Sequence, residues 1–202
     1  ALDLIEAERI SVLHGVPTQT WEVMQSDKFD STDLRSLRGI QSGGAPRPPE
    51  HLSMMLDKFP DQAIPGLGYG LTETNAIGAI ISGKFYESRP HSTGRPTPPV
   101  TTLLIHDEAG REFKTGEVGE ICIKGPTIMK GYWNKPEATA EVIKDGWLYT
   151  GDLATMDEDG FFWIVGRKKD MILCSGYNVY PDEVDRVLMA HPAVLEAATI
   201  GI

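Results

Sequence analysis

A carboxylate and a guanidinium, on Asp152 and Arg167, occur at positions that suit nucleotide binding. Asp152 precedes one strand-like segment, Arg167 follows another at 161–165, and the sequence Asp157-Glu-Asp-Gly160 between them is typical of a hairpin turn. We therefore predict that the two side chains lie at opposite ends of two paired strands, on one rim. A carboxylate accepts two hydrogen bonds from a vicinal diol, and an arginine donates to ribose or phosphate oxygens. An exposed salt bridge across a hairpin is the alternative.

A second group of functional side chains lies in the sequence Gly68-Tyr-Gly-Leu-Thr-Glu-Thr74. The alternate glycines at 66–70 do not have the spacing of the dinucleotide-binding fingerprint, so a Rossmann site is excluded. Tyr69 can stack on a purine, Thr72 can donate to a phosphate oxygen, and Glu73 can help to hold Mg²⁺ bound to phosphate. Taken alone, the stretch is equally consistent with a turn that has a few satisfied polar groups.

A third stretch, Ser42-Gly-Gly-Ala-Pro46, follows a predicted strand at 38–41 and precedes a predicted helix at 48–59. This order places it at the carboxyl edge of an α/β sheet, where ligands of such sheets bind. Its two glycines lack Cβ atoms and allow the backbone to approach a flat base or an acyl group. A plain strand-to-helix turn is the alternative.

These stretches, together with two others, resemble in order and spacing the signatures of the adenylate-forming enzymes, which comprise acyl-CoA synthetases, adenylation domains of peptide synthetases and luciferases. The matching segments are Ser42–Pro46, Gly68–Thr74, Tyr149–Asp152, Gly166–Asp170 and Ser175–Val184.

The resemblance implies an AMP-forming acid–thiol ligase that uses ATP/AMP, Mg²⁺ and CoA and acts on a small-molecule carboxylic acid. It implies catalytic roles for Thr72 and Glu73, with Glu73 as the metal-binding residue, and a hinge at Lys169. The nucleotide and CoA contacts that it implies are Gly44, Ala45, Pro46, Tyr69, Gly70 and Thr72 for the adenine and phosphate side, Asp152 and Arg167 for ribose, and Gly176 for the CoA arm.

The motifs look most like those of fatty-acyl-CoA or medium-chain acyl-CoA ligases, with malonyl-, aryl- and coumaroyl-CoA ligases as close competitors. An adenylation domain of a peptide synthetase is a second enzyme hypothesis, and a non-catalytic AMP-binding fragment is a third. Neither the family's glycine-rich phosphate loop nor its C-terminal catalytic lysine occurs in the sequence. We therefore expect a partial chain that is inactive by itself.

Composition narrows the classes of function further. The chain has 202 residues, of which 41% are hydrophobic, and a formal net charge of −10, which disfavours non-specific nucleic-acid binding. The sequence shows no secretory signal and no apolar run long enough to span a membrane, which favours a cytoplasmic location. Cys122 and Cys174 lie in apolar runs and are predicted to be buried and reduced. The oligomeric state is not specified.

The alternation of helical and strand-like segments predicts an α/β segment, then a small β-barrel-like or distorted-sheet subdomain, then the start of a small α+β domain. The predicted domains are 1–93, 94–167 and 168–202. Helices are predicted at 2–9, 17–25, 48–59, 136–144 and 181–191. Strands are predicted at 10–13, 38–41, 101–106, 118–124, 153–156, 161–165, 171–174 and 194–202, with a largely parallel first sheet.

Overall fold

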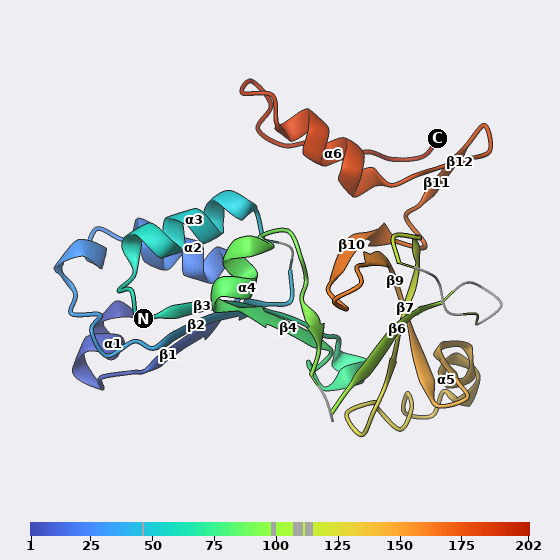
Figure 1. Ribbon diagram of the computed structural model, residues 1–202, viewed down its shortest axis with the longest axis horizontal. Coiled ribbons are helices and arrows are strands. Elements are labelled where there is room, and N and C mark those ends of the chain that lie inside the picture. The colour runs from blue at the N-terminus through green and yellow to red at the C-terminus, as the bar shows by residue number, and fades with distance from the viewer. Residues whose placement is uncertain (46, 98–99, 107–110, 112–114) are drawn as a thin grey trace. The chain divides into compact units, whose positions relative to one another are not determined.

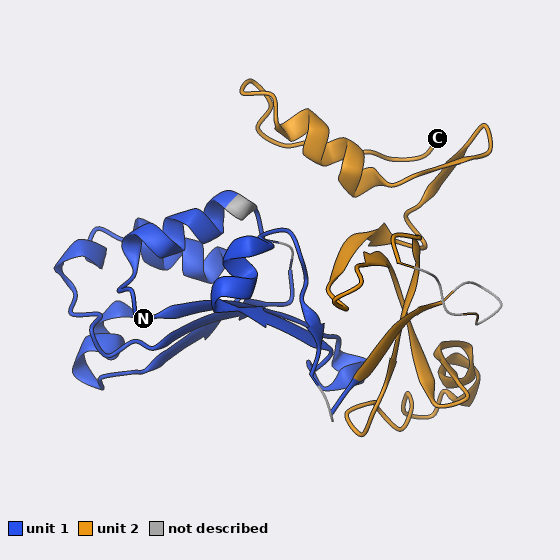
Figure 2. Ribbon diagram, in the orientation of Figure 1, with its two compact units in different colours: residues 1–101 blue, residues 102–202 orange. Residues whose placement is uncertain are grey.

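The computed structural model describes residues 1–45, 47–97, 100–106, 111 and 115–202. These residues form two compact units, residues 1–101 and residues 102–202 (Figure 2). The boundaries predicted at 93/94 and 167/168 stay predictions. Among the described residues, no helix combines the length and the apolar character needed to cross a membrane.

The first unit is built on a mixed sheet with the strand order β1-β2-β3-β4-β5. Its elements are α1 (Leu2–Ala7), β1 (Val12–Gly15), α2 (Pro17–Gln25), η1 (Phe29–Ser31), β2 (Gly39–Gly43), α3 (Pro49–Lys58), β3 (Ile64–Tyr69), η2 (Thr72–Thr74), β4 (Ala79–Ser82), α4 (Gly83–Ser88) and β5 (Arg95–Pro96). Strands β1 to β3 are parallel, whereas β4 and β5 pair antiparallel, so the largely parallel sheet predicted from the sequence is wrong in its second half. The short η2 turn replaces a helical crossover, and a strand after so short a connection must return antiparallel.

Helices α2, α3 and α4 lie on one face of this sheet (Figure 1). Helix α2 spans the predicted residues because a proline at its first position fixes a helical φ where no backbone donor is needed. Phe29 and Phe59 meet edge to face, with ring centroids 5.1 Å apart. The buried core of the unit also contains Leu2, Ile5, Met24, Leu34, Leu37, Ile40, Met55 and Ala63.

Strand β3 was not predicted, because glycines and a proline in Ile64–Tyr69 favour a turn. It nevertheless lies between β2 and β4 in the middle of the sheet. The reason is a close backbone approach: a Cβ atom on Gly43 would lie 2.6 Å from the carbonyl oxygen of Gly68 on the paired strand. The glycines therefore allow the two strands to pair at this edge.

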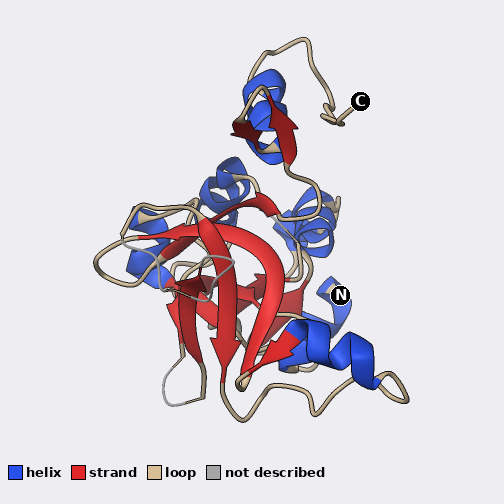
Figure 3. Ribbon diagram, turned by 90° about the vertical axis from the view of Figure 1, so that its right-hand side faces the viewer, coloured by secondary structure: helices blue, strands red, loops and turns tan. Residues whose placement is uncertain are grey.

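The second unit contains an antiparallel sheet with the strand order β10-β9-β7-β6, and β8 pairs with β9. Its elements are β6 (Thr102–His106), β7 (Gly119–Lys124), α5 (Pro136–Val142), β8 (Ile143–Lys144), β9 (Trp147–Met156), β10 (Phe162–Arg167), β11 (Ile172–Cys174), β12 (Tyr177–Val179) and α6 (Pro181–Met189). Two register shifts, between Glu120 and Cys122 and between Ile164 and Gly166, mark β-bulges. Figure 3 shows strongly curved strands, as bulges produce.

The sheet of the second unit is open in the part of the chain that the structure describes. Strands β6 and β10 are its two ends and do not pair with each other, so of the two predicted forms it is the distorted sheet and not the barrel. The helix predicted at 136–144 ends at Val142, because the next two residues pair with β9 as β8. The core includes Leu103, Ile105, Ile121, Ile123, Leu148, Phe161 and Phe162.

Strands β11 and β12 form a separate antiparallel ribbon, and α6 follows it. The strand predicted at 194–202 is wrong: this segment has no regular secondary structure, and Leu195 is 92% exposed. No described strand pairs with it, so its apolar side chains lack a sheet on which to pack. The hydroxyl of Thr199 donates to Oδ1 of Asp185 on α6, at 2.6 Å.

Candidate functional site

The carboxyl ends of β2 and β3 form one edge of the first sheet, as predicted for the loop at 42–46. Gly43 pairs with Gly68 in the parallel register. Gly44 follows with a φ of +79°, the left-handed region that favours glycine, and both Gly44 and Ala45 are exposed. The loop therefore presents bare backbone at this edge. Pro46 lies outside the described residues.

Tyr69 ends β3 at the same edge and is 9% exposed. Only a small part of the ring is therefore available in this chain for stacking on a purine. Gly70 follows in close contact with the backbone of a later turn, since a Cβ at this position would lie 2.4 Å from the carbonyl carbon of Ala76. Ala76 itself has a φ of +63°.

The single turn η2 carries the predicted phosphate-side residues. Thr72 is exposed and Glu73 is partly exposed. The Thr74 side chain fixes the turn, because its Oγ1 accepts from the Leu71 backbone N–H and donates to the Leu71 carbonyl oxygen, both at 3.0 Å. Thr74 is fully buried, so the turn has a rigid base beneath its two more exposed polar side chains.

Asp152 and Arg167 are brought together by the second unit. They are directly opposite each other on β9 and β10, with Arg167 Nε donating to Asp152 Oδ1 at 3.3 Å. The prediction that they share a rim fits this pairing, but Asp152 lies inside β9 and does not precede the strand, as the sequence had suggested. The Asp152 side chain is only 10% exposed, whereas that of Arg167 is 53% exposed. The pair therefore differs from an exposed surface ion pair, because its anion is sheltered from water.

A bulge in β9 positions Asp152. Gly151 has a φ of +77°, and its backbone N–H donates to Glu120 Oε1 at 2.9 Å. Thr150 Oγ1 donates to the Ile121 carbonyl oxygen at 2.9 Å and accepts from the Asp152 N–H at 3.1 Å. The extra residues of the bulge thus find partners in β7 and in their own strand, as buried backbone groups require.

A turn follows β10 at the predicted hinge. The N–H groups of Asp170 and Met171 both donate to the Arg167 carbonyl oxygen at 3.1 Å. Lys169 is exposed, and so is Gly176, which has a φ of +84° in the turn between β11 and β12. Both therefore stand at turns whose side chains or backbone are accessible to solvent.

The described residues contain no group of three or more His, Cys, Asp or Glu side chains that could hold a metal ion. Cys122 is buried as predicted, and burial raises the pKa of its thiol to about 12. Cys174 is exposed, contrary to the prediction, because the two-stranded ribbon leaves it uncovered.

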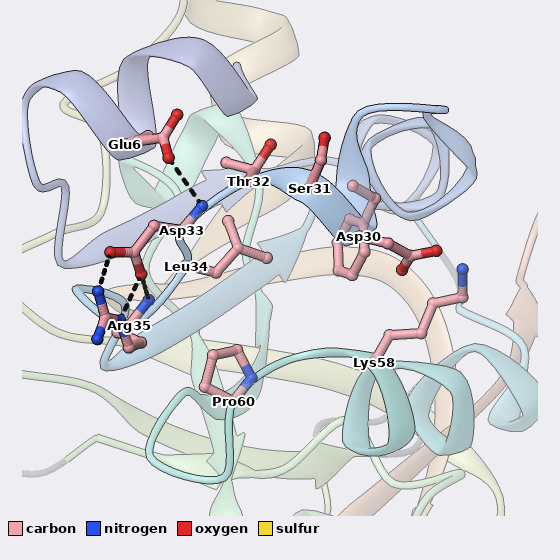
Figure 4. A pocket seen from close by; sticks show the side chains of 10 residues that line it. Glu6, Asp30, Ser31, Thr32, Asp33, Leu34, Arg35, Lys58 and Pro60 are labelled. Atoms are coloured by element: carbon pink, nitrogen blue, oxygen red, sulfur yellow. Dashed lines mark hydrogen bonds and ion pairs between the residues drawn. The ribbon is translucent and has the colours of Figure 1, made fainter.

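Figure 4 shows a surface hollow of about 520 Å³ in the first unit. Its wall includes Glu6, Asp33 and Arg35, which bond to one another: the Asp33 N–H donates to Glu6, and Arg35 Nη2 lies 2.6 Å from Asp33 Oδ2. None of the predicted site residues lines this hollow. It is therefore separate from the candidate site.

The comparisons with known proteins identify the family of the chain. The model of the family described as AMP-binding enzyme matches residues 1–133. The chain belongs to this family. The match covers the glycine loop at 42–46 and the turn at 72–74, and ends before Asp152.

Curated relatives extend the similarity across the whole chain. A feruloyl-CoA synthase from Amycolatopsis sp is 40% identical over 205 residues, covering 100% of this chain and 40% of that protein. A long-chain-fatty-acid–CoA ligase from Bacillus subtilis is 39% identical over 203 residues, covering 100% of this chain and 35% of that protein. The chain thus spans well under half the length of these relatives.

Solved structures show the same fold. An amide bond synthetase from Marinactinospora thermotolerans has a TM-score of 0.89 and 34% identity, and the match covers 100% of this chain and 41% of that one. The o-succinylbenzoate coenzyme A synthetase from Bacillus subtilis, solved with ATP and magnesium ion, has a TM-score of 0.87 and 32% identity, with 100% and 41% covered.

Three side chains next to these site residues were not predicted from the sequence. Glu120 and Lys168 pair beside the bulge, their carboxylate and ammonium groups 3.3 Å apart. Arg47 follows the glycine loop and is 8% exposed, with Nη2 donating to the Gly66 carbonyl oxygen at 3.0 Å. Burial lowers the pKa of Arg47, and its guanidinium lies 5.4 Å from the centre of the Tyr86 ring. The sequence signal that could have indicated Arg47 is the position of an arginine among the prolines at 46–49.

Proposed function

We propose that the full-length polypeptide activates a carboxylic acid with ATP and transfers the acyl group to the thiol of CoA. In the first step, a carboxylate oxygen attacks the α-phosphorus, the bond to the bridging oxygen breaks, and pyrophosphate leaves. In the second, the CoA sulfur attacks the acyl carbonyl carbon, the thiol proton is lost to solvent, and AMP leaves. The paired Asp152 and Arg167, in a chain of the AMP-binding family, are the observation that carries the proposal.

Asp152 and Arg167 are proposed to bind the ribose. A largely buried carboxylate that is already paired with a guanidinium is a preorganised acceptor for the two hydroxyl groups of a diol. The half-exposed guanidinium keeps donors available to solvent-side oxygens. A diol bound in this way requires no reorganisation of the bulge, whose backbone bonds are already made.

The first unit is proposed to supply the adenine and phosphate contacts. The exposed backbone of Gly44 and Ala45 suits a flat base, and Gly70 and the accessible part of Tyr69 are proposed to lie beside it. The role of Pro46 stays a prediction from the sequence. On the turn η2, Thr72 would donate to a phosphate oxygen, and Glu73 would hold Mg²⁺. Mg²⁺ neutralises phosphate charge when bound, which favours departure of pyrophosphate.

Lys169 is proposed as the hinge between the two half-reactions, with Gly176 facing the CoA arm in the second. The support is local: the turn at 168–170 follows the sheet directly, and the Gly176 turn tips a ribbon outside that sheet. A cytoplasmic location also stays a prediction.

A long-chain fatty acid is proposed as the acyl substrate, in line with the curated ligases of that class. Similarity to a feruloyl-CoA synthase and to an o-succinylbenzoate coenzyme A synthetase makes an aryl acid the competing choice. A second candidate function is acyl transfer to an amine, favoured by the likeness to an amide bond synthetase. The peptide-synthetase alternative is distinguished by a requirement for a carrier protein as acceptor.

The test is ATP–pyrophosphate exchange by the full-length protein with fatty acids, ferulate and o-succinylbenzoate, followed by mass spectrometry of the products formed with CoA or an amine. Asp152→Ala should raise the ATP KM by about tenfold or more, since hydrogen bonds to charged groups contribute about 1.5–3 kcal/mol each. Asp33→Ala, which removes another aspartate paired with an arginine, is the matched control and should leave the ATP KM unchanged. Unchanged ATP kinetics for Asp152→Ala would refute the ribose assignment.

A further inference from the structure

Glu120 makes two contacts at the bulge that carries Asp152. Its Oε1 accepts from the Gly151 N–H at 2.9 Å, and its Oε2 accepts from Lys168 Nζ at 3.3 Å. The Glu120 side chain is only 12% exposed, whereas that of Lys168 is 42% exposed. A sheltered carboxylate with one backbone donor and one ammonium donor is an oriented group, because both of its oxygens are engaged.

The peptide groups on either side of Gly151 are held from two directions. Glu120 holds the Gly151 N–H, while the Gly151 carbonyl oxygen accepts from the Lys168 N–H at 2.8 Å. The second of these groups leads directly into Asp152, and Lys168 directly precedes Lys169. One side chain on β7 therefore contacts both the residue before the proposed ribose carboxylate and the residue before the proposed hinge.

We propose that Glu120 is a positioning residue that fixes Asp152 through the Gly151 N–H and restrains the hinge through Lys168. The inference rests on the proposed function. Without Glu120, the Gly151 N–H loses its acceptor, so the peptide between Thr150 and Gly151 loses this restraint and the bulge that precedes Asp152 can shift. Nucleotide binding then suffers through geometry, although Glu120 itself touches no substrate. Loss of the Lys168 contact alone should act on the hinge and so on the balance between the two half-reactions.

Three variants separate these contacts. Glu120→Gln keeps a side-chain oxygen for the Gly151 N–H but removes the charge that attracts Lys168, whereas Glu120→Ala removes both. Lys168→Met removes the ammonium and keeps the backbone N–H that bonds to Gly151. Lys28→Met is the matched control, because Lys28 forms an exposed ion pair with Asp3 at 2.9 Å.

The experiment measures the ATP KM in pyrophosphate exchange, the rate of thioester formation from pre-formed acyl-adenylate, and the thermal midpoint, all on the full-length protein. We expect Glu120→Ala to raise the ATP KM about tenfold and Glu120→Gln to restore most of this loss, as expected for a lost and a retained hydrogen bond. Glu120→Gln and Lys168→Met should change the ratio of the two half-reaction rates by the same factor, and the double variant should change it no further. Lys28→Met should change none of these quantities.

A purely structural role predicts a different pattern. In that case Glu120→Ala would lower the thermal midpoint with the ATP KM unchanged, and the ratio of half-reaction rates would stay constant in every variant. Either that pattern or additive effects of Glu120→Gln and Lys168→Met on the ratio would overturn the inference. If Glu120→Ala does not fold, Glu120→Gln and Lys168→Met still decide it through the ratio. A wild-type protein that exchanges no pyrophosphate with any acid refutes the proposed function and the inference together, whereas an active wild type with an unchanged ratio refutes the inference alone.

Discussion

Replacement of Gly70 by alanine tests whether close backbone contact positions the turn that carries Thr72 and Glu73. A Cβ at position 70 would lie 2.4 Å from the carbonyl carbon and oxygen of Ala76 and 2.9 Å from the backbone nitrogen of Ile77. The nearest contacts are thus about 1 Å too short. All of these atoms belong to the backbone, so no side-chain rotation can relieve the overlap, and the turn itself has to move.

The size of the effect follows from this displacement. Inserting a methyl group into a well-packed site costs about 1–3 kcal/mol of stability. A misplacement of about 1 Å in a group that positions substrate can cost about a hundredfold in rate. Gly160→Ala is the matched control: Gly160 has a φ of +78° with no atom within 4 Å of its added Cβ, so the variant carries left-handed strain of about 1–2 kcal/mol without a clash.

Pyrophosphate exchange and urea unfolding, measured on the full-length protein, separate the two effects. Gly70→Ala should lose exchange activity far beyond its loss of stability, whereas Gly160→Ala should lose stability and keep its activity. If both variants lost activity in proportion to stability, the turn would have no special positioning role. Exchange by Gly70→Ala at the wild-type rate would show that Thr72 and Glu73 do not depend on the contact with Ala76.

Three other predictions concern the second unit. Lys169→Pro should slow thioester formation more than adenylation, because a fixed φ restricts rotation at the hinge; equal losses in separately measured half-reactions would contradict it. Iodoacetamide at pH 8 should modify Cys174 quickly and Cys122 only after denaturation, as peptide mass mapping would show, because burial both blocks access and holds the pKa of Cys122 near 12. Phe162→Ala should lower the free energy of unfolding by about 3–5 kcal/mol, since its fully buried ring leaves a cavity; a loss below about 1 kcal/mol in urea titration would count against that packing.

Local signals predicted α1, α2, α3, α5 and α6, whereas α4 was not predicted. Prolines at 17, 136 and 181 mark the starts of α2, α5 and α6, because a proline at the first helical position costs no hydrogen bond. The end of α5 was placed too late because strand pairing of Ile143 with Leu148 ends the helix, and a helical pattern carries no information about a partner strand. The central strand β3 was missed for the same reason. Its glycines indicate a turn when the sequence is considered alone, and their pairing with β2 is known only from the structure.

The candidate site also contains residues that local sequence signals predict and residues that they do not. Asp152 and Arg167 were found because a hairpin makes their relation local, and the structure places them in direct register. Glu120 could not be found in this way, since it lies on β7 and reaches Gly151 only through sheet pairing and a bulge. A glutamate near the start of a strand is usually a solvated end residue, and nothing in its neighbours along the chain distinguishes this one.

The two groups of proposed nucleotide contacts are therefore held by different forces. Close backbone packing at Gly43 and Gly70 fixes the first unit's loop and turn, and such packing does not depend on salt or on charge. In the second unit a sheltered carboxylate, Asp152, is held through hydrogen bonds and ion pairs that include Glu120. A buried carboxylate without its partner carries a large desolvation penalty. The free-energy costs of two single substitutions there should therefore add up to more than the cost of the double variant. This arrangement requires two results. Substitutions of charged residues in the second unit should have non-additive effects, and glycines of the first unit should not tolerate a larger side chain.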